Sequence, residues 1–395
     1  NPLEGVEQHR ALDPEGRVQA ICLAPFGLAF DCADEATTPA GVRRTTLSYE
    51  SGRLSAVDGP RSDIPDITTF TYHTTTDETG CDTNGPCHRA GDLWRVTSPL
   101  GLVTEYARYD RAGRPTRVLD ANGVATDLAY NARGWLVTRN VRGADDNSEA
   151  DDSITMLAYD AVGNVVQVTQ PDGSTLAFEY DDAHRLVAVE DALGNRIEYT
   201  LDGAGQTLQE QVRDDNGTLR HSLSRVYDAL GQLETLADAQ ANPTDFTYDA
   251  VGNADTVTDA LGRVNDLEHD PLGRLVQSIA NVNGSGAERA VTGMAYDALD
   301  RLVSVTDPKG LTTQYTYDGL GNLVELDSPD TGVASYGYDA AGNRTSVLDA
   351  RGVQRYYSYD ALGRLTGVDV PTVGEDTSLV YDTAPVACQA GEAFA

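Results

Sequence analysis

The most reactive side chains of this sequence belong to its five cysteines, and four of these form two close pairs. The pairs are Cys22 with Cys32 and Cys81 with Cys87. Cysteines paired at short spacing favour disulfide bonds, which form and persist in exported proteins. We therefore predict two local disulfides and an extracytoplasmic location. Cys388 has no nearby partner, and it could pair with a residue beyond the end of this sequence.

A metal site is the alternative chemistry for the second cysteine pair, because two histidines stand near it. The four candidate ligands are His73, Cys81, Cys87 and His88. Common zinc sites space their ligands as two close pairs separated by a longer segment. The four residues do not follow that spacing, so the sequence favours the disulfide and predicts no metal and no cofactor.

Aspartate is the other abundant residue that could do chemistry, as a catalytic acid or as a calcium ligand. Asp120–Gly123 and Asp214–Gly217 resemble the start of a calcium loop but lack its distal glutamate. Both follow the pattern Asp-x-x-Gly, in which the carboxylate bonds the backbone ahead of it and the glycine tolerates positive φ. The sequence also contains none of the patterns of serine hydrolases, zinc proteases or phosphate-binding loops. We expect turn-forming aspartates and no enzyme.

A repeat that contains the dipeptide Tyr-Asp organises most of the chain. Its period is 21 residues, since 248 − 227 = 21 and 338 − 317 = 21. The signature tyrosines are Tyr109, Tyr130, Tyr159, Tyr180, Tyr227, Tyr248, Tyr296, Tyr317, Tyr338, Tyr359 and Tyr381. Degenerate copies begin at Leu201 and His269. A fixed period of this size predicts a repeat architecture in which each unit packs against its neighbours.

Each repeat contains two turn signals, Tyr-Asp-x-x-Gly and Asp-x-x-Gly, with room for a strand of about 5–7 residues after each. In the second strand aromatic residues stand two apart, as Tyr315 and Tyr317 do, which places them on one face. The sequence thus predicts an all-β fold of antiparallel hairpins in a curved sheet. We expect the repeat tyrosines to be buried in that sheet, in ladders, and not at a ligand site.

The first strand of the repeat is harder to interpret. Leu302, Val303 and Val305 are all apolar and cannot all face one side of a strand. A β-bulge would explain the pattern, and so would a sheet that is covered on both faces. The sequence leaves both explanations open.

The repeat is lengthened at three places, each after the second turn signal. The extra residues fall in 143–153, 214–218 and 281–287, so that every third repeat carries a long loop. Chance insertion is one explanation. The other is a structural period of about three repeats, which predicts that the long loops emerge at one edge or face of a curved sheet.

Composition limits the partners of the chain. Its net charge of −33 repels phosphate backbones and anionic membranes, so we expect no nucleic-acid partner. No apolar run is long enough for membrane insertion, and the chain opens without Met and without a signal peptide. Tyr-rich repeats also occur in sugar-binding arrays, but those use tryptophan cages and this chain has two Trp, which makes carbohydrate the less favoured partner.

The segment 359–368 reads Tyr-Asp-Ala-Leu-Gly-Arg-Leu-Thr-Gly-Val. With its flanking Asp-x-x-Gly turns, it closely resembles the Rhs or YD-repeat family, and the resemblance covers roughly residues 87–382. It implies a long β-sheet that spirals into a hollow shell. In bacterial Rhs toxins and insecticidal toxin complexes such a shell encloses a toxic C-terminal domain. Related YD shells occur in wall-associated bacterial proteins and in animal teneurins, where they serve in cell-cell contact.

The resemblance implies three parts: degenerate repeats in 1–86, a regular array in 87–382 and a truncated continuation in 383–395. We expect a non-catalytic shell segment of a secreted or surface bacterial protein, which encapsulates and delivers a C-terminal toxin domain not present in this chain. Its partner is then the remainder of its own longer polypeptide. The alternative is an adhesion or wall-associated protein that acts in cell-cell contact or glycan binding. Nothing here matches the family's plug and self-cleavage site, and we expect a section of the shell wall.

Overall fold

The protein is described by a computed structural model, which covers residues 6–25, 27–34, 39, 41–81, 83, 85–144, 149–284, 289–371, 374 and 376–381. Cys388 and the segment 383–395 lie outside the described residues. Within those residues the chain contains 31 strands and no helix, and all strands belong to one sheet. Each strand pairs in antiparallel fashion with the next strand in the sequence. The all-β prediction is confirmed.

The strands have the following bounds: β1 (Val6–Leu12), β2 (Val18–Pro25), β3 (Arg43–Glu50), β4 (Arg53–Asp58), β5 (Ile67–Tyr72), β6 (Leu93–Thr97), β7 (Val103–Tyr109), β8 (Pro115–Leu119), β9 (Ala125–Tyr130), β10 (Leu136–Val141), β11 (Ser153–Tyr159), β12 (Val165–Thr169), β13 (Thr175–Tyr180), β14 (Leu186–Asp191), β15 (Arg196–Leu201), β16 (Thr207–Arg213), β17 (Leu219–Tyr227), β18 (Leu233–Ala237), β19 (Pro243–Tyr248), β20 (Ala254–Thr258), β21 (Val264–His269), β22 (Leu275–Ala280), β23 (Ala290–Tyr296), β24 (Leu302–Thr306), β25 (Thr312–Tyr317), β26 (Leu323–Ser328), β27 (Gly332–Tyr338), β28 (Arg344–Leu348), β29 (Gln354–Tyr359), β30 (Leu365–Asp369) and β31 (Thr377–Ser378).

A β-bulge beside the repeat tyrosine explains the apolar run in the first strand of the repeat. In the β23–β24 hairpin Tyr296 is opposite Leu302, but Ala295 is opposite Ser304, which leaves Val303 as the extra residue. The same register shift comes directly before Tyr317 in the next repeat. Of the two explanations that the sequence left open, the bulge is therefore the correct one.

Antiparallel pairing gives the sheet two edges with different turns. Most turns that follow an odd-numbered strand, such as the turn from β25 to β26, contain Tyr-Asp, and we call their side the Tyr-Asp edge. Six of the turns that follow an even-numbered strand have the form Asp-x-x-Gly, and we call their side the Asp-Gly edge. Asp120–Gly123 and Asp214–Gly217 are such turns, closed by a hydrogen bond that the glycine N–H donates to the aspartate carbonyl at 2.9 and 2.8 Å.

The three long loops follow β10, β16 and β22, and so all lie on the Asp-Gly edge. Residues 145–148 and 285–287 of these loops lie outside the described residues. For the described parts the prediction of a shared edge is confirmed. The interval is constant at six strands, since 16 − 10 = 6 and 22 − 16 = 6.

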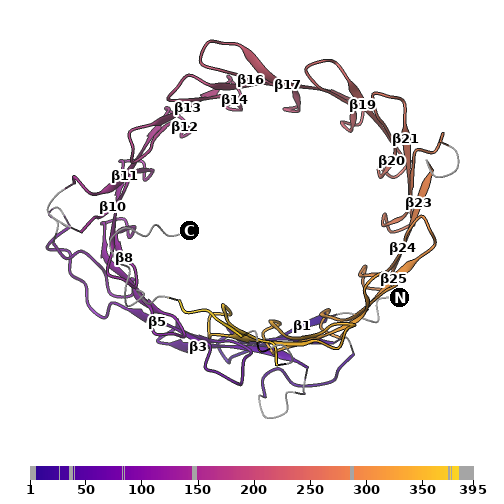
Figure 1. The fold of residues 1–395 in the computed structure, drawn as a ribbon. Coiled ribbons are helices and arrows are strands. Elements are labelled where there is room, and N and C mark those ends of the chain that lie inside the picture. Colours follow the sequence, from indigo (N-terminus) through magenta and orange to yellow (C-terminus); the bar gives the residue numbers. More distant parts are fainter. Residues whose placement is uncertain are drawn as a thin grey trace.

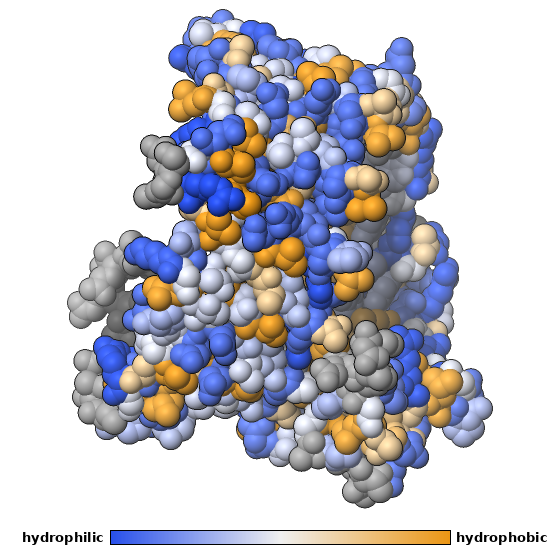
Figure 2. All heavy atoms as spheres, turned by 90° about the vertical axis from the view of Figure 1, so that its right-hand side faces the viewer, coloured by the Kyte–Doolittle hydropathy of each residue, from blue (hydrophilic) through white to orange (hydrophobic). Residues whose placement is uncertain are grey.

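The sheet coils into a ring, and its C-terminal strands come round to lie against its N-terminal strands (Figure 1). The first and last strands do not pair with each other, so the sheet is a spiral and not a closed barrel. The expected section of the wall is thus more than one full turn. Figure 2 shows small apolar groups scattered among polar side chains on the side of the wall that includes β20–β24.

Few side chains are fully buried, because one sheet layer makes up the wall. The largest fully buried side chains are Cys22 and Cys87. The core cluster consists of Ala11, Ala20, Cys22 and Cys32, with Phe30 and Val42 packed against it. In the part of the chain that the structure describes, no helix has the length and apolar character needed to cross a membrane.

Candidate functional site

The Tyr-Asp turn is a compact hydrogen-bonded unit, and the turn after β25 is representative. Asp318 Oδ1 accepts hydrogen bonds from the backbone N–H groups of Leu320 at 2.9 Å and Asn322 at 2.8 Å. Asn322 Nδ2 donates to Asp318 Oδ2 at 2.6 Å. Gly321 has φ of +82°, which an L-residue rarely adopts, and its N–H donates to the carbonyl of Asp318 at 3.1 Å. The carboxylate is therefore fully used by the turn.

Three of the turn aspartates illustrate how the turn favours the ionised carboxylate. The pKa values of Asp181, Asp249 and Asp270 are all lowered, chiefly by a side-chain hydrogen bond from the residue four positions later. That residue is Arg185 in the first turn and Arg274 in the third. A general acid at neutral pH needs the opposite shift. These carboxylates fit structural roles.

Each signature tyrosine ties its strand to the preceding strand. Tyr317 Oη donates a hydrogen bond to the carbonyl of Leu302, the first residue of β24, at 2.9 Å. The same bond is made by Tyr109, Tyr130, Tyr159, Tyr180, Tyr227, Tyr248, Tyr296, Tyr338, Tyr359 and Tyr381. Leu201 and His269 occupy this position in the degenerate copies and carry no phenol.

The prediction that these tyrosines are buried was wrong for most of them. Tyr109 is 6% exposed, but the others are half-buried, and Tyr381 is 38% exposed. The reason is that, among the residues the structure describes, no second layer covers the sheet. Tyr109 differs because the inserted loop 73–92 lies beside it, and its N–H donates to the carbonyl of Cys87 at 2.8 Å. Burial raises the pKa of Tyr109 to about 12.

At several places along the Tyr-Asp edge an arginine connects one turn to the next. Arg274 Nε donates to its own turn aspartate, Asp270, at 2.7 Å, and its Nη1 donates to the carbonyl of Asp297 in the next turn at 3.0 Å. Its guanidinium also lies 5.1 Å from the ring centre of Tyr296. Arg301 repeats this arrangement one turn later, with Asp318 and Tyr317. Such contacts stabilise each turn through its neighbour in the repeat array.

Where the spiral overlaps itself, two arginines of the Asp-Gly edge contact later Tyr-Asp turns. Arg43 Nη2 donates to Asn322 Oδ1 at 2.9 Å. Arg61 Nη1 donates to the carbonyl of Asp360 at 2.8 Å, and its Nε lies 3.7 Å from Asp339 Oδ2. The side chain of Arg61 is only 6% exposed and that of Asp339 10%. This is an internal contact between two turns of the wall.

The overlap also requires a small residue at Gly319. A Cβ atom added there would lie 2.7 Å from the side chain of Pro25. Pro25 ends β2, while Gly319 belongs to the turn after β25, so one circuit of the ring takes 23 strands here (25 − 2 = 23).

The apolar residues at the tips of the Tyr-Asp turns differ in exposure. In the overlap Leu320 is half-buried and Leu362 is 41% exposed. Away from the overlap the equivalent residues are 85% exposed at Leu230, 84% at Val251 and 73% at Leu272. The Tyr-Asp edge between β17 and β22 is therefore an uncovered apolar edge.

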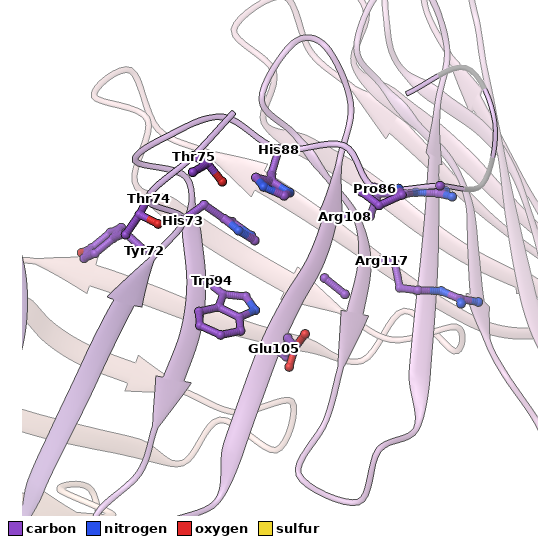
Figure 3. Close-up of a pocket in the computed structure, with 12 residues that line it drawn as sticks. Tyr72, His73, Thr74, Thr75, Pro86, His88, Trp94, Glu105, Arg108 and Arg117 are labelled. Atoms are coloured by element: carbon purple, nitrogen blue, oxygen red, sulfur yellow. The ribbon is translucent and has the colours of Figure 1, made fainter. Parts of the chain in front are cut away.

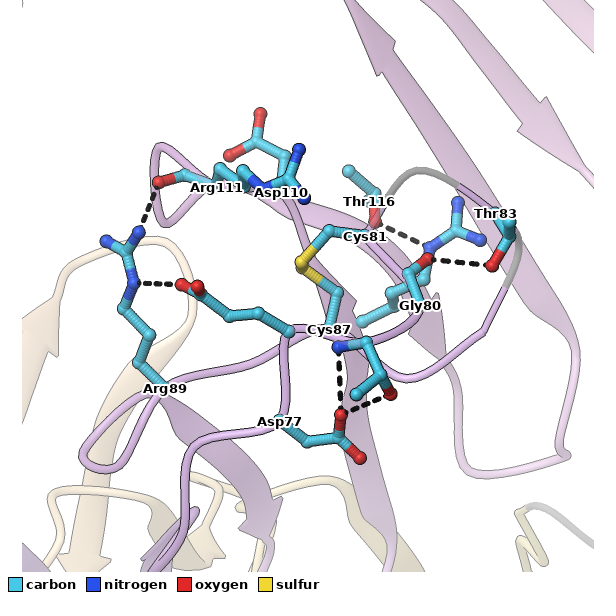
Figure 4. The surroundings of a disulfide bond; sticks show 12 residues. Asp77, Gly80, Cys81, Thr83, Cys87, Arg89, Asp110, Arg111 and Thr116 are labelled. Atoms are coloured by element: carbon cyan, nitrogen blue, oxygen red, sulfur yellow. Dashed lines mark hydrogen bonds and ion pairs between the residues drawn. A yellow bond between two sulfur atoms is a disulfide. The ribbon is translucent and has the colours of Figure 1, made fainter.

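The structure bonds Cys22 to Cys32 and Cys81 to Cys87, with Cα–Cα distances of 5.9 and 4.8 Å. The first bond joins β2 to the loop that follows it, beside the overlap. The second closes the inserted loop between β5 and β6 (Figure 4). Arg89 fastens that loop, since its Nη2 donates to the carbonyl of Arg111 at 2.7 Å.

A pocket of about 580 Å³ lies under the inserted loop (Figure 3). His73 and His88 stack there with ring centres 3.7 Å apart, and Trp94, Glu105 and Arg108 also line it. Burial, and then the neighbouring His88, lower the pKa of His73. Cys81 and Cys87 are bonded to each other, and among the described residues no group of three or more histidine, cysteine or carboxylate side chains could hold a metal ion.

Comparison with known proteins matches these repeats to a family. The RHS Repeat model matches residues 88–125, 109–146, 159–196, 180–219, 296–333 and 338–372. These segments of the chain are RHS repeats.

Two relatives of this RHS-repeat chain are named as toxins. Over 130 residues the chain is 30% identical to the double-stranded DNA deaminase toxin A of Burkholderia cenocepacia. The aligned region covers 28% of this chain and 9% of that protein. Over 135 residues it is 29% identical to the probable deoxyribonuclease RhsB of Dickeya dadantii, which covers 30% of this chain and 9% of that protein. The chain thus spans less than a tenth of these relatives.

Solved structures show the same fold. The crystal structure of TcdB2-TccC3-Cdc42 is similar with a TM-score of 0.51 and 17% identity, over 94% of this chain and 22% of the other. The crystal structure of TcdB2-TccC3 is similar with a TM-score of 0.51 and 17% identity, over 92% of this chain and 22% of the other. At this identity the likeness concerns the fold alone. The RHS-repeat chain is a segment of a shell-like β-wall.

Sequence reasoning found the turns and the tyrosines but missed the overlap. Arg43 and Arg61 carry no motif, and their partners lie 279 and 299 residues away. One signal was present. An apolar residue recurs two positions after the turn aspartate, as Leu230, Val251 and Leu272 show, although a solvent-exposed turn does not need an apolar side chain.

Proposed function

We propose that this chain is a non-catalytic wall segment of an exported bacterial container, and that the container encloses a toxin domain carried farther along the same polypeptide. The observation that carries the proposal is the spiral itself. One sheet coils through more than a full turn, and Arg43 and Arg61 fasten the second turn to the first. A wall built in this way can continue by adding turns and can enclose a space.

Two further observations support a container over an enzyme or a nucleic-acid binder. The turn carboxylates are occupied by backbone and side-chain donors, as for Asp318, and so are not available for acid-base chemistry. The net charge of −33 opposes nucleic-acid binding by the wall. The activities in the relatives' names then belong to other parts of those proteins, because this chain covers 9% of each.

The cysteine pairs support export. A disulfide between Cys22 and Cys32 in the buried cluster stabilises the first turn in an oxidising compartment and is reduced in most cytosols. We propose that both disulfides form in the exported protein. We also propose that residue 86 divides degenerate repeats from the regular array. The sheet itself continues from β5 to β6 without a break.

A protease-site experiment tests the container. A recognition site for a sequence-specific protease is inserted in the region downstream of residue 395 in the complete gene product, and cleavage is timed. We expect cleavage at least about tenfold slower than in a control that lacks residues 87–382, because the enclosed site is reached only through local opening. Equal cleavage in both proteins would exclude enclosure. Binding of the purified chain to cells would then favour the adhesion alternative.

A further inference from the structure

Three departures from the regular repeat meet in the pocket under the inserted loop. The first is His73, which follows the repeat tyrosine Tyr72 at the position of the turn aspartate. The second is Trp94, which is the extra residue of the β5–β6 bulge. The same bulge position holds Val303 in β24 and Val324 in β26. The repeat fold therefore needs neither the histidine nor the tryptophan.

The third departure is a second bulge in β7. Tyr106 is opposite Val118 and Arg108 is opposite Arg117, which leaves Ala107 as the extra residue. Bulges turn side chains in new directions and are frequent beside functional sites. This bulge places two arginines directly opposite each other, and like charges in that arrangement destabilise a sheet. Both arginines line the pocket, where an anion would reduce their repulsion.

The aromatic rings and the arginines lie on opposite sides of the pocket (Figure 3). His88 and His73 stack with ring centres 3.7 Å apart, and the ring of Trp94 continues this aromatic column at 5.8 Å from His73. Arg108 and Arg117 lie across the pocket from the column. The volume of about 580 Å³ is within the usual range of small-molecule sites. A ligand that fits has an apolar face for the rings and a polar group for the arginines.

The charges of the pocket favour an anionic group in the ligand. Asp127 accepts hydrogen bonds from Arg117 at 2.7 and 2.9 Å, and this pair holds the guanidinium in place. The carboxylate of Glu105 is paired with Arg95 at 2.8 Å, and the guanidinium of Arg95 lies 4.0 Å from the ring centre of Trp94. A cationic ligand would meet arginines on both sides. The aromatic column is therefore not a cage for a quaternary ammonium group.

The inserted loop is fastened in a way that keeps the pocket formed. The disulfide between Cys81 and Cys87 closes the loop next to His88. The backbone of His88 exchanges two hydrogen bonds with Asp77, at 2.9 and 2.8 Å. Arg89 pairs with a carboxylate of the same loop at 2.8 Å. A site that is ordered before binding loses less entropy when a ligand enters.

We propose that this pocket binds an acidic sugar, a pyranose ring that carries a carboxylate. The carboxylate lies at Arg108 and Arg117, since guanidinium groups pair with carboxylates through parallel hydrogen bonds. The C–H face of the ring packs on the aromatic column, and the sugar hydroxyls bond Thr75 and Glu105. A single carboxylate also suits a chain whose net charge of −33 repels polyanions such as nucleic acids.

The proposal goes beyond the container wall, because it assigns a ligand to the inserted loop whether or not the wall encloses a toxin. An exported protein meets acidic sugars in cell-surface polysaccharides. The pocket is then a recognition site on a wall whose regular repeats are structural.

Titration with a disaccharide of glucuronate and galactose, which has a single carboxylate, tests the proposal. Trp135→Phe leaves Trp94 as the one tryptophan of the chain, so that its fluorescence reports a ligand in the pocket. Calorimetry measures the affinity of residues 1–395. We expect saturable binding of the acid, and binding at least about tenfold weaker for its methyl ester, which keeps the ring and removes the charge.

Two variants separate the roles of the rings and the arginines. Trp94→Val restores the residue of the regular bulge, so the fold is kept, and the affinity should fall about tenfold or more. Arg117→Gln should reduce the preference for the acid over its methyl ester. Asp127 keeps Arg142 as a partner at 2.8 Å in that variant. Arg263→Gln, at an exposed arginine away from the pocket, should leave binding unchanged.

Four outcomes overturn the proposal. The pocket is not a sugar site if the disaccharide gives neither heat nor a fluorescence change at millimolar concentration. Equal affinity for the acid and its methyl ester would contradict the role of the arginines. Inorganic phosphate that binds as tightly as the disaccharide would make the pocket a simple anion site. Undiminished binding to Trp94→Val would place the ligand elsewhere. The protease-site experiment is independent of all four, because it measures enclosure and not binding.

Discussion

The overlapped and the single-layer parts of this wall use the same turn but differ in what covers it. In the single layer, Asp249 accepts hydrogen bonds from Val251 N and Asn253 N, both at 2.9 Å. In the overlap, Asp318 accepts the same two bonds at 2.9 and 2.8 Å. The turn is thus fixed by bonds within five residues, while its environment is set by where the spiral returns. Local hydrogen bonds determine the conformation of each turn, and the curvature of the sheet determines which turns contact each other.

The largest difference between the two parts should appear when an arginine is removed. Arg61→Ala breaks the contacts with Asp339 and Asp360 across the overlap. We expect the free energy of opening the overlap to fall by about 3 kcal/mol, at the low end for a broken buried ion pair, because Asp339 keeps its bonds within its own turn. Hydrogen exchange of the turns at 339–343 and 360–364 measures the change.

Arg263→Ala is the matched control in the single layer. Arg263 pairs with Asp259 at 2.6 Å, but its side chain is 62% exposed, so its removal should leave exchange rates nearly unchanged. If the two variants behave alike, the contacts of Arg61 do not hold the turns of the wall together.

The disulfides offer the next largest effect. Replacing Cys22 and Cys32 by Ala should lower the free energy of unfolding of the N-terminal strands by about 3 kcal/mol, because the unfolded loop is no longer closed. Replacing Cys81 and Cys87, which close a shorter loop, should lower the free energy of unfolding by about 2 kcal/mol. Urea unfolding with and without reductant measures both. Free thiols in a mass map of the unreduced protein would show that the bonds are absent.

The tyrosines should not distinguish the two parts. Tyr317→Ala in the overlap and Tyr248→Ala in the single layer should each cost about 2 kcal/mol, less than a fully buried aromatic residue, because both rings are half-buried. Replacing either tyrosine by Phe should lower the free energy of unfolding by about 1 kcal/mol, because the hydrogen bond to the carbonyl of Leu302 or Leu233 is lost. Denaturant unfolding gives the values. A much larger loss for Tyr317 would mean that this residue also acts between turns of the wall.

Much of the repeat could be predicted from the sequence because its causes are local. Asp and Gly at fixed spacing specify the turn, and alternation specifies the strand, so the hairpins and the edge of the long loops followed. The burial of the tyrosines was wrongly predicted, since aromatic residues in a strand usually face a second layer and this wall has none. The contact of Arg61 with Asp360 could not be predicted, because it depends on a small curvature summed over many strands.

The inserted loop 73–92 should differ from the regular turns in its response to pH. Burial and the stacked His88 lower the pKa of His73, while Asp92 and Glu105 oppose the shift and Trp94 packs nearby without charge. Between the unfolded pKa of about 6.5 and the lower folded value, the unfolded state binds more protons. The stability of the loop is therefore complete above this window and falls as the pH drops through it.

Hydrogen exchange of residues 73–92, corrected for intrinsic rates, should be faster at pH 5 than at pH 7.5. Exchange in the turn at Asp270 should not change over this range, because its lowered pKa keeps the carboxylate ionised. His73→Phe should remove the pH dependence, and His221→Gln, at an exposed position of β17, should retain it. A pH response that survives in His73→Phe would assign the titration to another group. A response lost only in that variant would show that the inserted loop, unlike the repeats around it, is held by a neutral histidine.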